Sequence, residues 1–98
     1  MAGYILSERA QNDLRRIWHY TVGTWSIEQA KRYYNEILDT CEAIANGQSR
    51  PGSSFEGIRL GVHGFRMKHH VIFYRILSDG KIRIIRILHD RMDFPRHF

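Results

Sequence analysis

Apolar residues in the first half of the chain recur with the period of an α-helix. A short apolar run, Tyr4–Leu6, ends at Ser7, which is a suitable helix N-cap, and apolar positions then follow every three or four residues to about Gly23. A second pattern of this kind runs from Ser26 to Asn46, opens with the spacing of a capping box and stops at Gly47. Because the two segments are only a few residues apart, we predict a brief strand followed by an antiparallel helical hairpin.

The second half of the chain changes to the alternating period of β-strands. Ile58–Phe65 predicts a broken strand, in which the glycines at 57, 61 and 64 indicate a bulge or a bend. His70–Leu77 and Lys81–His89 predict two further strands, joined through Asp79-Gly80 as a two-residue hairpin loop. This loop sets four expected cross-strand pairs: Leu77 with Ile82, Tyr74 with Ile85, Phe73 with Arg86, and His70 with His89.

In that register both faces of the predicted hairpin are mostly apolar. We expect one face to hold Val71, Phe73, Arg75, Leu77, Ile82, Ile84, Arg86 and Leu88, and the other to hold His70, Ile72, Tyr74, Ile76, Arg83, Ile85, Ile87 and His89. The helical hairpin can cover only one of these faces, so we expect the C-terminal segment and a protein partner to cover the other. Two alternatives stay open, namely that the tail Met92–Phe98 closes this face alone or that the chain forms a homodimer.

Size and composition favour one intracellular domain spanning residues 1–98. The chain has 98 residues, of which 43% are hydrophobic and 26% charged, an ordinary globular balance. Its single cysteine, Cys41, cannot form an intrachain disulfide, which suits a reducing cytoplasm, and we interpret this residue as a buried apolar position of a helix. No apolar run approaches the ~20 residues of a membrane-spanning helix. We therefore predict an α+β fold, with an N-terminal helical hairpin packed on a C-terminal antiparallel β-sheet and a short C-terminal helix or tail.

Positive charge is concentrated in the second half. Residues 50–98 contain ten lysines and arginines against four aspartates and glutamates, whereas residues 1–49 contain five against six. Such a basic half favours an acidic protein partner or a nucleic-acid machine, because Coulomb attraction and counterion release both favour association. The simpler alternative is that the positive charge serves only to keep the protein soluble.

The order and spacing of these residues resemble one known family along essentially the whole chain. The first half carries Tyr4-Ile5-Leu6-Ser7, Ala10, Asp13-Leu14, Ile17, Tyr20-Thr21, Trp25 and Gln29-Ala30. The second half carries Ile58-Arg59, Gly61, His70-Val71-Ile72-Phe73-Tyr74-Arg75, Ile84, Arg86-Ile87-Leu88-His89, Arg91-Met92-Asp93 and Arg96-His97. This pattern is similar to the ParE toxins of the RelE/ParE superfamily, the plasmid-stabilisation type of toxin–antitoxin system.

The resemblance implies a function through protein partners and no cofactor. ParE-like members inhibit DNA gyrase and so halt replication, and they are neutralised by a ParD-type antitoxin that also binds operator DNA. RelE-like members of the same superfamily instead cleave mRNA on the ribosome, which is the alternative function. An inactive binding module that retains only the antitoxin complex is a third possibility.

Candidate site residues follow from this comparison and from the charge pattern. We expect antitoxin contacts at Tyr74, Arg75, Arg83 and Arg86, and target contacts at Arg91, Asp93, Arg96 and His97. If the chain is a nuclease, its catalytic residues would be His89, His70 and Arg75, since phosphodiester cleavage needs an acid or base and a cation. We consider a structural His70–His89 pair the better explanation. The histidines lack a recognised metal-ligand spacing, so we expect no metal site.

Overall fold

The computed structural model describes residues 3–47, 53–54 and 61–98. Two helices come first, α1 (Glu8–Thr24) and α2 (Ile27–Ala45), preceded by strand β1 (Tyr4–Leu6). The strands β2 (Ser53–Ser54), β3 (His63–Met67), β4 (His70–Ile76) and β5 (Ile82–His89) follow, and the 3₁₀ helix η1 (Phe94–His97) comes last. The α+β class predicted from the sequence is confirmed, while the predicted strand segment 58–60 lies outside the described residues.

The helical hairpin begins and ends as its sequence predicts. The Ser7 hydroxyl accepts the Ala10 N–H at 3.0 Å, and Ser26 forms a reciprocal capping box with Gln29. Gly47 follows the C-cap of α2 with a φ of 70°, a left-handed conformation that favours glycine. These local signals set where the helices begin and where α2 ends.

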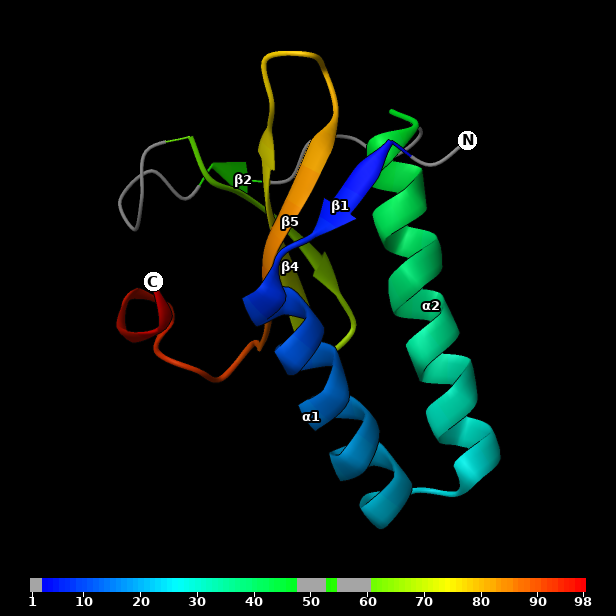
Figure 1. Ribbon diagram of the computed structural model, residues 1–98. Helices are drawn as coiled ribbons and strands as arrows, with labels where there is room; N and C mark the ends of the chain where they lie inside the picture. Colours follow the sequence, from blue (N-terminus) through cyan, green and yellow to red (C-terminus); the bar gives the residue numbers. More distant parts are fainter. Residues whose placement is uncertain (1–2, 48–52, 55–60) are drawn as a thin grey trace.

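The sheet is mixed, because the first strand joins it in parallel. Its order is β1-β5-β4-β3-β2, and every pair except β1–β5 is antiparallel. Both helices cover one face of this sheet, and η1 lies on the other side (Figure 1). The predicted strand Tyr4–Leu6 is present and the C-terminal strands are antiparallel as predicted, but the parallel pairing of β1 with β5 over three residues was not predicted.

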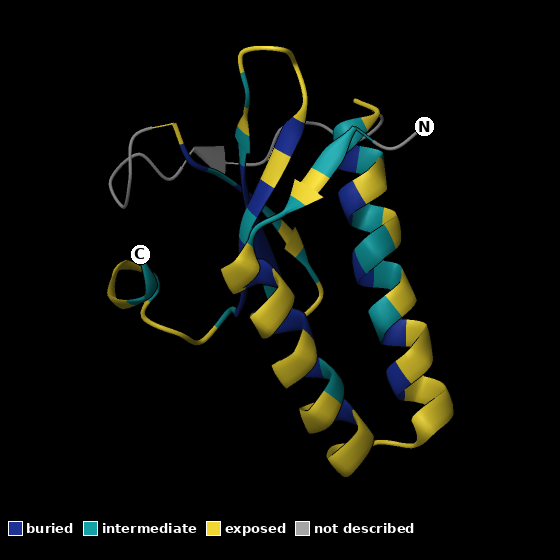
Figure 2. Ribbon diagram, in the orientation of Figure 1, coloured by how far each residue is buried: buried dark blue, intermediate teal, exposed yellow. Residues whose placement is uncertain are grey.

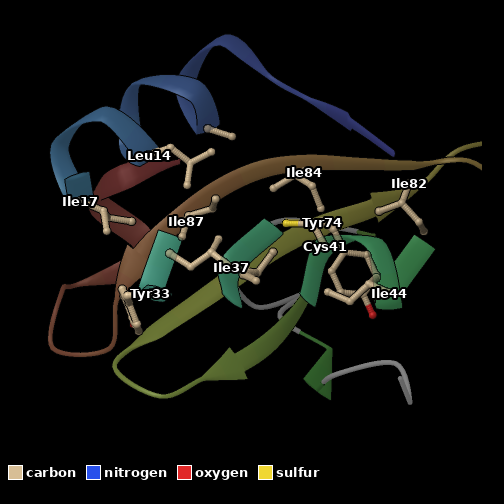
Figure 3. Packing of buried hydrophobic residues seen from close by; sticks show 12 residues of the cluster. Leu14, Ile17, Tyr33, Ile37, Cys41, Ile44, Tyr74, Ile82, Ile84 and Ile87 are labelled. Carbon is tan, nitrogen blue, oxygen red and sulfur yellow. The ribbon is translucent and has the colours of Figure 1, made fainter. Parts of the chain in front are cut away.

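The main core lies between the helices and one sheet face. Buried positions line the side of each helix that faces the sheet (Figure 2). Leu14 and Ile17 of α1 and Ile37 and Cys41 of α2 meet side chains of β4 and β5 there (Figure 3). Burial raises the pKa of the Cys41 thiol to about 12, so it stays protonated and packs as an apolar group.

The hairpin between β4 and β5 has a different register from the predicted one. Leu77 pairs with Lys81 through a three-residue loop, in which Gly80 has a φ of 86°. Next to this loop the pairs are shifted by one residue, so Ile82 lies opposite Ile76 and Ile84 lies opposite Tyr74. The predicted pairs Leu77–Ile82 and Tyr74–Ile85 are therefore wrong.

A bulge restores the predicted pairing farther from the loop. Between Phe73 and Tyr74 the register shifts, which leaves Ile85 as an extra residue on β5. Phe73–Arg86 and His70–His89 pair as predicted. Because the side-chain period of a strand is two, the shift moves Ile82 and Ile84 to the helix side and Ile85 to the other side. Arg83 lies between Ile82 and Ile84 and pairs with Arg75, so it too lies on the face opposite to the predicted one. The predicted division of β5 between the two faces is therefore wrong for these four residues.

The second face of the sheet is covered by the protein's own tail. Phe94 and Phe98 each pack edge-to-face on Phe73, with ring centroids 5.0 Å apart. Together with Val62, Val71 and Leu88 they form a second, smaller core. The expectation that a partner must cover this face is therefore wrong around Phe73, and the alternative in which the tail closes it is correct.

Candidate functional site

Four residues were expected to contact an antitoxin, and the structure separates them into two pairs. Tyr74 is 2% exposed and belongs to the core under the helices. Arg86 is 8% exposed. Arg75 is half-buried and Arg83 is exposed, and both line a surface groove. The expectation of surface contacts therefore fails for Tyr74 and Arg86, whereas the side chains of Arg75 and Arg83 reach the surface.

Arg86 joins three parts of the chain from a buried position. Its Nε and Nη2 donate to the two carboxylate oxygens of Asp13 at 2.8 Å each, and its Nη1 donates to the backbone carbonyl of His97 at 2.6 Å. The same Asp13 carboxylate accepts the backbone N–H of Ile87 at 2.9 Å. This clamp ties α1 and the tail to β5, and it leaves the Arg86 guanidinium committed to structural contacts.

A groove with a basic lining runs beside the tail on the sheet face opposite the helices. Its volume is about 760 Å³, and its wall comes from the start of α1, strands β4 and β5, and Phe98. The groove is lined by Ser7, Glu8, Arg9, Arg75, Leu77, Arg83, Ile85, Arg86 and Phe98. We refer to it as the basic groove.

Two arginines face each other across the strands of the basic groove. Arg75 and Arg83 are direct cross-strand partners, and like charges in such a pair destabilise a sheet. In residues 3–47, 53–54 and 61–98, neither has a carboxylate within 4 Å. The two guanidinium groups thus lack an ion-pair partner among the described residues, although Glu8 also lines the groove, and an anionic ligand would reduce their repulsion.

The expected target-binding residues lie on the segment that follows β5. Arg91, Asp93 and Arg96 are exposed, and Asp93 approaches Arg96 at 3.8 Å. His97 is half-buried, and its backbone carbonyl accepts the Arg86 hydrogen bond described above. The segment therefore presents charged side chains while its backbone is held against the sheet.

The residues named for a nuclease do not gather at one place. His70 and His89 are neighbours, with ring centroids 5.3 Å apart, and the Tyr33 hydroxyl lies 2.6 Å from His70 Nδ1. Burial, and then the charges of His89 and His69, lower the pKa of His70 to about 4, so it is a weak base at neutral pH. Arg75 lines the basic groove on the opposite sheet face, whereas His70 contacts Tyr33 of α2.

A second hollow lies between α1 and α2. It has a volume of about 490 Å³ and is lined by Leu14, Arg15, Trp18, Lys31, Tyr34 and Asn35. Trp18 and Tyr34 pack edge-to-face at 5.9 Å and stay half-buried, so their rings are part of the surface as well as of the packing. None of the residues that line this hollow was predicted as a site residue, although basic residues beside aromatic ones are a sequence signal that could have indicated an accessible groove.

The described part of the chain was also compared with the requirements of a metal site and of a membrane-spanning helix. No group of three or more histidine, cysteine, aspartate or glutamate side chains there is arranged to hold a metal ion. No described helix combines the length and apolar character needed to cross a membrane.

Comparisons with known proteins agree on one family. Residues 4–94 match the family model described as the ParE toxin of the type II toxin–antitoxin system parDE. A protein named Toxin ParE1 from Mycobacterium tuberculosis is 35% identical over 94 residues, covering 96% of this chain and 95% of that protein. Another Toxin ParE1, from Caulobacter vibrioides, is 38% identical over 99 residues, covering 99% and 98% respectively.

A solved structure supports the same fold. It is described as a chromosomal ParDE TA system from P. aeruginosa, and one of its chains superposes with a TM-score of 0.74 at 19% sequence identity. The match covers 91% of this chain and 96% of that one. At this level of identity the likeness establishes the fold.

Proposed function

Because this chain belongs to the ParE toxin family of type II toxin–antitoxin systems, we propose that it arrests growth by inhibiting DNA gyrase and is neutralised by a ParD-type antitoxin. The observation that carries the proposal is the family match over residues 4–94. In the complex, the antitoxin would supply operator binding. The toxin would act by binding its target, without a catalytic step and without a cofactor.

The basic groove is the proposed antitoxin site. Arg75 and Arg83 would bind carboxylates, and bidentate pairing with guanidinium groups gives such contacts strength and direction. Leu77, Ile85 and Phe98 supply an apolar floor beside them. An extended segment that carries both acidic and apolar residues fits this lining, and its carboxylates would relieve the Arg75–Arg83 repulsion.

A charge reversal tests this assignment. Arg83→Glu should weaken antitoxin binding by about 1 to 3 kcal/mol if the pair is desolvated, measured by calorimetry against the matched control Lys81→Glu. Lys81 is exposed at the hairpin loop and outside the groove, and its reversal changes net charge equally. Equal affinities for the two variants would contradict the groove assignment. Arg86 is unsuitable for this test, because its loss would break the buried clamp.

The target surface is proposed on the segment after β5, with Arg91, Asp93, Arg96 and His97. Truncation after Met92 would remove Phe94 and Phe98 from the second core, so it would disturb folding as well as any contact. Exposed charges offer a cleaner test. Arg91→Ala with Arg96→Ala should reduce growth arrest while the thermal unfolding midpoint stays unchanged, and full toxicity of the double variant would argue against this surface.

The competing function is ribosome-dependent mRNA cleavage by His89, His70 and Arg75. The weak basicity of His70 and the position of Arg75 on the other sheet face favour the binding mechanism. Induction without antitoxin separates the two. Gyrase inhibition predicts DNA-damage filamentation and inhibited supercoiling by the purified protein, whereas early mRNA cleavage that is lost in His89→Gln would establish the nuclease. Normal growth after induction would identify an inactive module.

A further inference from the structure

A small apolar pocket lies beside α1 and the end of β5, apart from the residues that line the basic groove. It has a volume of about 210 Å³ and lies between the middle of α1, the end of β5 and the residue Met92. The pocket is lined by Asp13, Arg16, Ile17, Tyr20, His70, Ile87, Leu88, His89 and Met92. We call it the Tyr20–Met92 pocket. The pocket and the basic groove have no lining residue in common, and Met92 lines the one whereas Phe98 lines the other.

Two large apolar side chains stand exposed at this pocket. Tyr20 is 66% exposed and Met92 is 43% exposed. Buried core residues, Ile17, Ile87 and Leu88, line the same pocket. Exposed aromatic and methionine side chains are enriched at protein interfaces, where they are buried on binding. Ligand pockets are typically about 300 Å³ or larger, so this smaller volume suits a single side chain better than a cofactor or nucleotide.

The interior of the pocket offers no unpaired charge. The Asp13 carboxylate is occupied by Arg86 and by the Ile87 N–H. Nδ1 of His70 is engaged with the Tyr33 hydroxyl, and the ring is neutral at physiological pH because its pKa is lowered by burial and by the neighbouring His89 and His69. An uncharged apolar group would therefore enter without leaving a buried ion unpaired.

The surroundings of the pocket are basic. Arg16 lines it with a side chain that is 75% exposed, and it reaches Asp13 only at 3.8 Å, where Arg86 already holds that carboxylate at 2.8 Å. Arg91 is exposed directly before Met92 and belongs to the proposed target surface. These cations would attract carboxylates placed beside an apolar side chain.

We propose that the Tyr20–Met92 pocket receives one aromatic or long aliphatic side chain of the protein that the toxin inhibits, with carboxylates beside it that pair with Arg16 and Arg91. The inference rests on the proposed function, because it needs a protein target. It assigns that target to a surface separate from the antitoxin groove. Toxicity and antitoxin binding should therefore be lost through different substitutions.

Substitutions of the exposed residues test the pocket with little risk to the fold. Tyr20→Ala and the double variant Tyr20→Ala with Met92→Ala should lose about tenfold or more in gyrase inhibition, as expected for removal of a central interface contact, and should lose growth arrest. Tyr20→Phe should retain most of the activity, because it keeps the apolar ring. Ile76→Ala is the matched control, since Ile76 is 54% exposed and lies outside the pocket.

Each result decides between the pocket and its alternatives. Lost inhibition with unchanged antitoxin affinity and an unchanged unfolding midpoint supports the proposal, as does weaker inhibition by Arg16→Glu than by Lys81→Glu. Inhibition within twofold of the unmodified chain in the double variant overturns it. A parallel loss of antitoxin binding would show that the antitoxin occupies the pocket. A dimer of the unmodified chain that dissociates in Tyr20→Ala would show that a second copy occupies it. Either result also overturns the proposal.

Failure of the proposed function would be seen separately. If the unmodified chain arrests growth but does not inhibit gyrase, the gyrase assignment fails, and the growth-arrest assay still decides the pocket. If the unmodified chain does neither, both proposals fail together. If the unmodified chain arrests growth and inhibits gyrase, and the pocket variants do so equally well, only the pocket proposal fails.

Discussion

The buried pair of Asp13 and Arg86 permits a stability prediction worked from its geometry. Asp13→Ala removes two of the three acceptors of the Arg86 guanidinium and the acceptor of the Ile87 backbone N–H. Asp13 is 4% exposed and Arg86 8%, so water cannot readily replace the lost partner. Removal of one member of a buried ion pair costs about 3 to 5 kcal/mol, and the orphaned N–H contributes to the same loss because it shares the carboxylate.

This cost is a large fraction of the stability of a small domain. Native proteins unfold with about 5 to 15 kcal/mol, and for a domain near this size about 1 kcal/mol shifts the thermal midpoint by roughly 4 to 8 °C. We therefore expect Asp13→Ala to melt at least about 12 °C lower than the unmodified chain. Urea and thermal unfolding followed by circular dichroism would measure the change.

Two controls separate the buried pair from a general loss of charge. Asp39→Ala removes an exposed carboxylate from α2 and should change stability by no more than about 0.5 kcal/mol. Asp13→Leu combined with Arg86→Met replaces both charges with apolar groups and should recover much of the loss. A cost below about 1 kcal/mol for Asp13→Ala, where values of about 3 to 5 are expected for a buried pair, would refute the reasoning.

Three further predictions concern the tail, the charge of one histidine and the hairpin loop. Phe98→Ala uncovers Phe73 and should destabilise the fold by about 1 to 3 kcal/mol, with an increase in binding of a dye that detects exposed apolar surface; unchanged dye binding would contradict the tail's covering role. The folded pKa of His70 lies near 4, below its ordinary value of 6.5, so the unfolded state binds the extra proton first and stability should fall as pH decreases from about 6.5 to about 4. His70→Gln should flatten that part of the stability profile, and an equally steep profile would exclude His70 as the cause. Gly80→Ala forces a side chain into a left-handed conformation and should cost about 1 to 2 kcal/mol in urea unfolding, whereas a neutral effect would show that the loop readily adopts another turn.

The elements of the fold were predictable because their signals are local. The caps at Ser7 and Ser26, the helical spacing between them and the glycine at the hairpin loop each act over a few residues. The parallel pairing of β1 was missed because it depends on contacts across most of the chain. Nothing within Tyr4–Leu6 indicates which strand it will join.

The error in the β4–β5 register shows how one extra loop residue changes which side chains of a strand lie on each face of the sheet. The loop was expected to contain two residues and contains three, and the bulge at Ile85 then compensates for the shift. A two-residue and a three-residue loop around Asp79-Gly80 have similar sequence signatures. The difference is decided by packing, which favours Ile82 and Ile84 under the helices.

The candidate site was only partly predictable for the same reason. Arg75 and Arg83 do reach the surface, but the register error placed them on opposite faces of the hairpin, whereas they are cross-strand partners on one face. Tyr74 and Arg86 were misplaced, since their burial depends on α1, α2 and the tail. Arg86 forms its ion pair with Asp13, which lies 73 residues earlier in the chain. Sequence periodicity contains no information about a contact between residues so far apart.

The pairing of β1 with β5 also affects when the protein can complete its fold during synthesis. The backbone N–H of Ile82 donates to the carbonyl of Gly3, and that of Ser7 donates to the carbonyl of Ile84, so β1 can be paired only after β5 has been synthesised. Contacts of such separation slow folding, because a long loop must close before they can form. The helical hairpin can form earlier in translation, whereas the edge of the sheet and both surfaces beside the tail can form only after β5 and the tail have been synthesised.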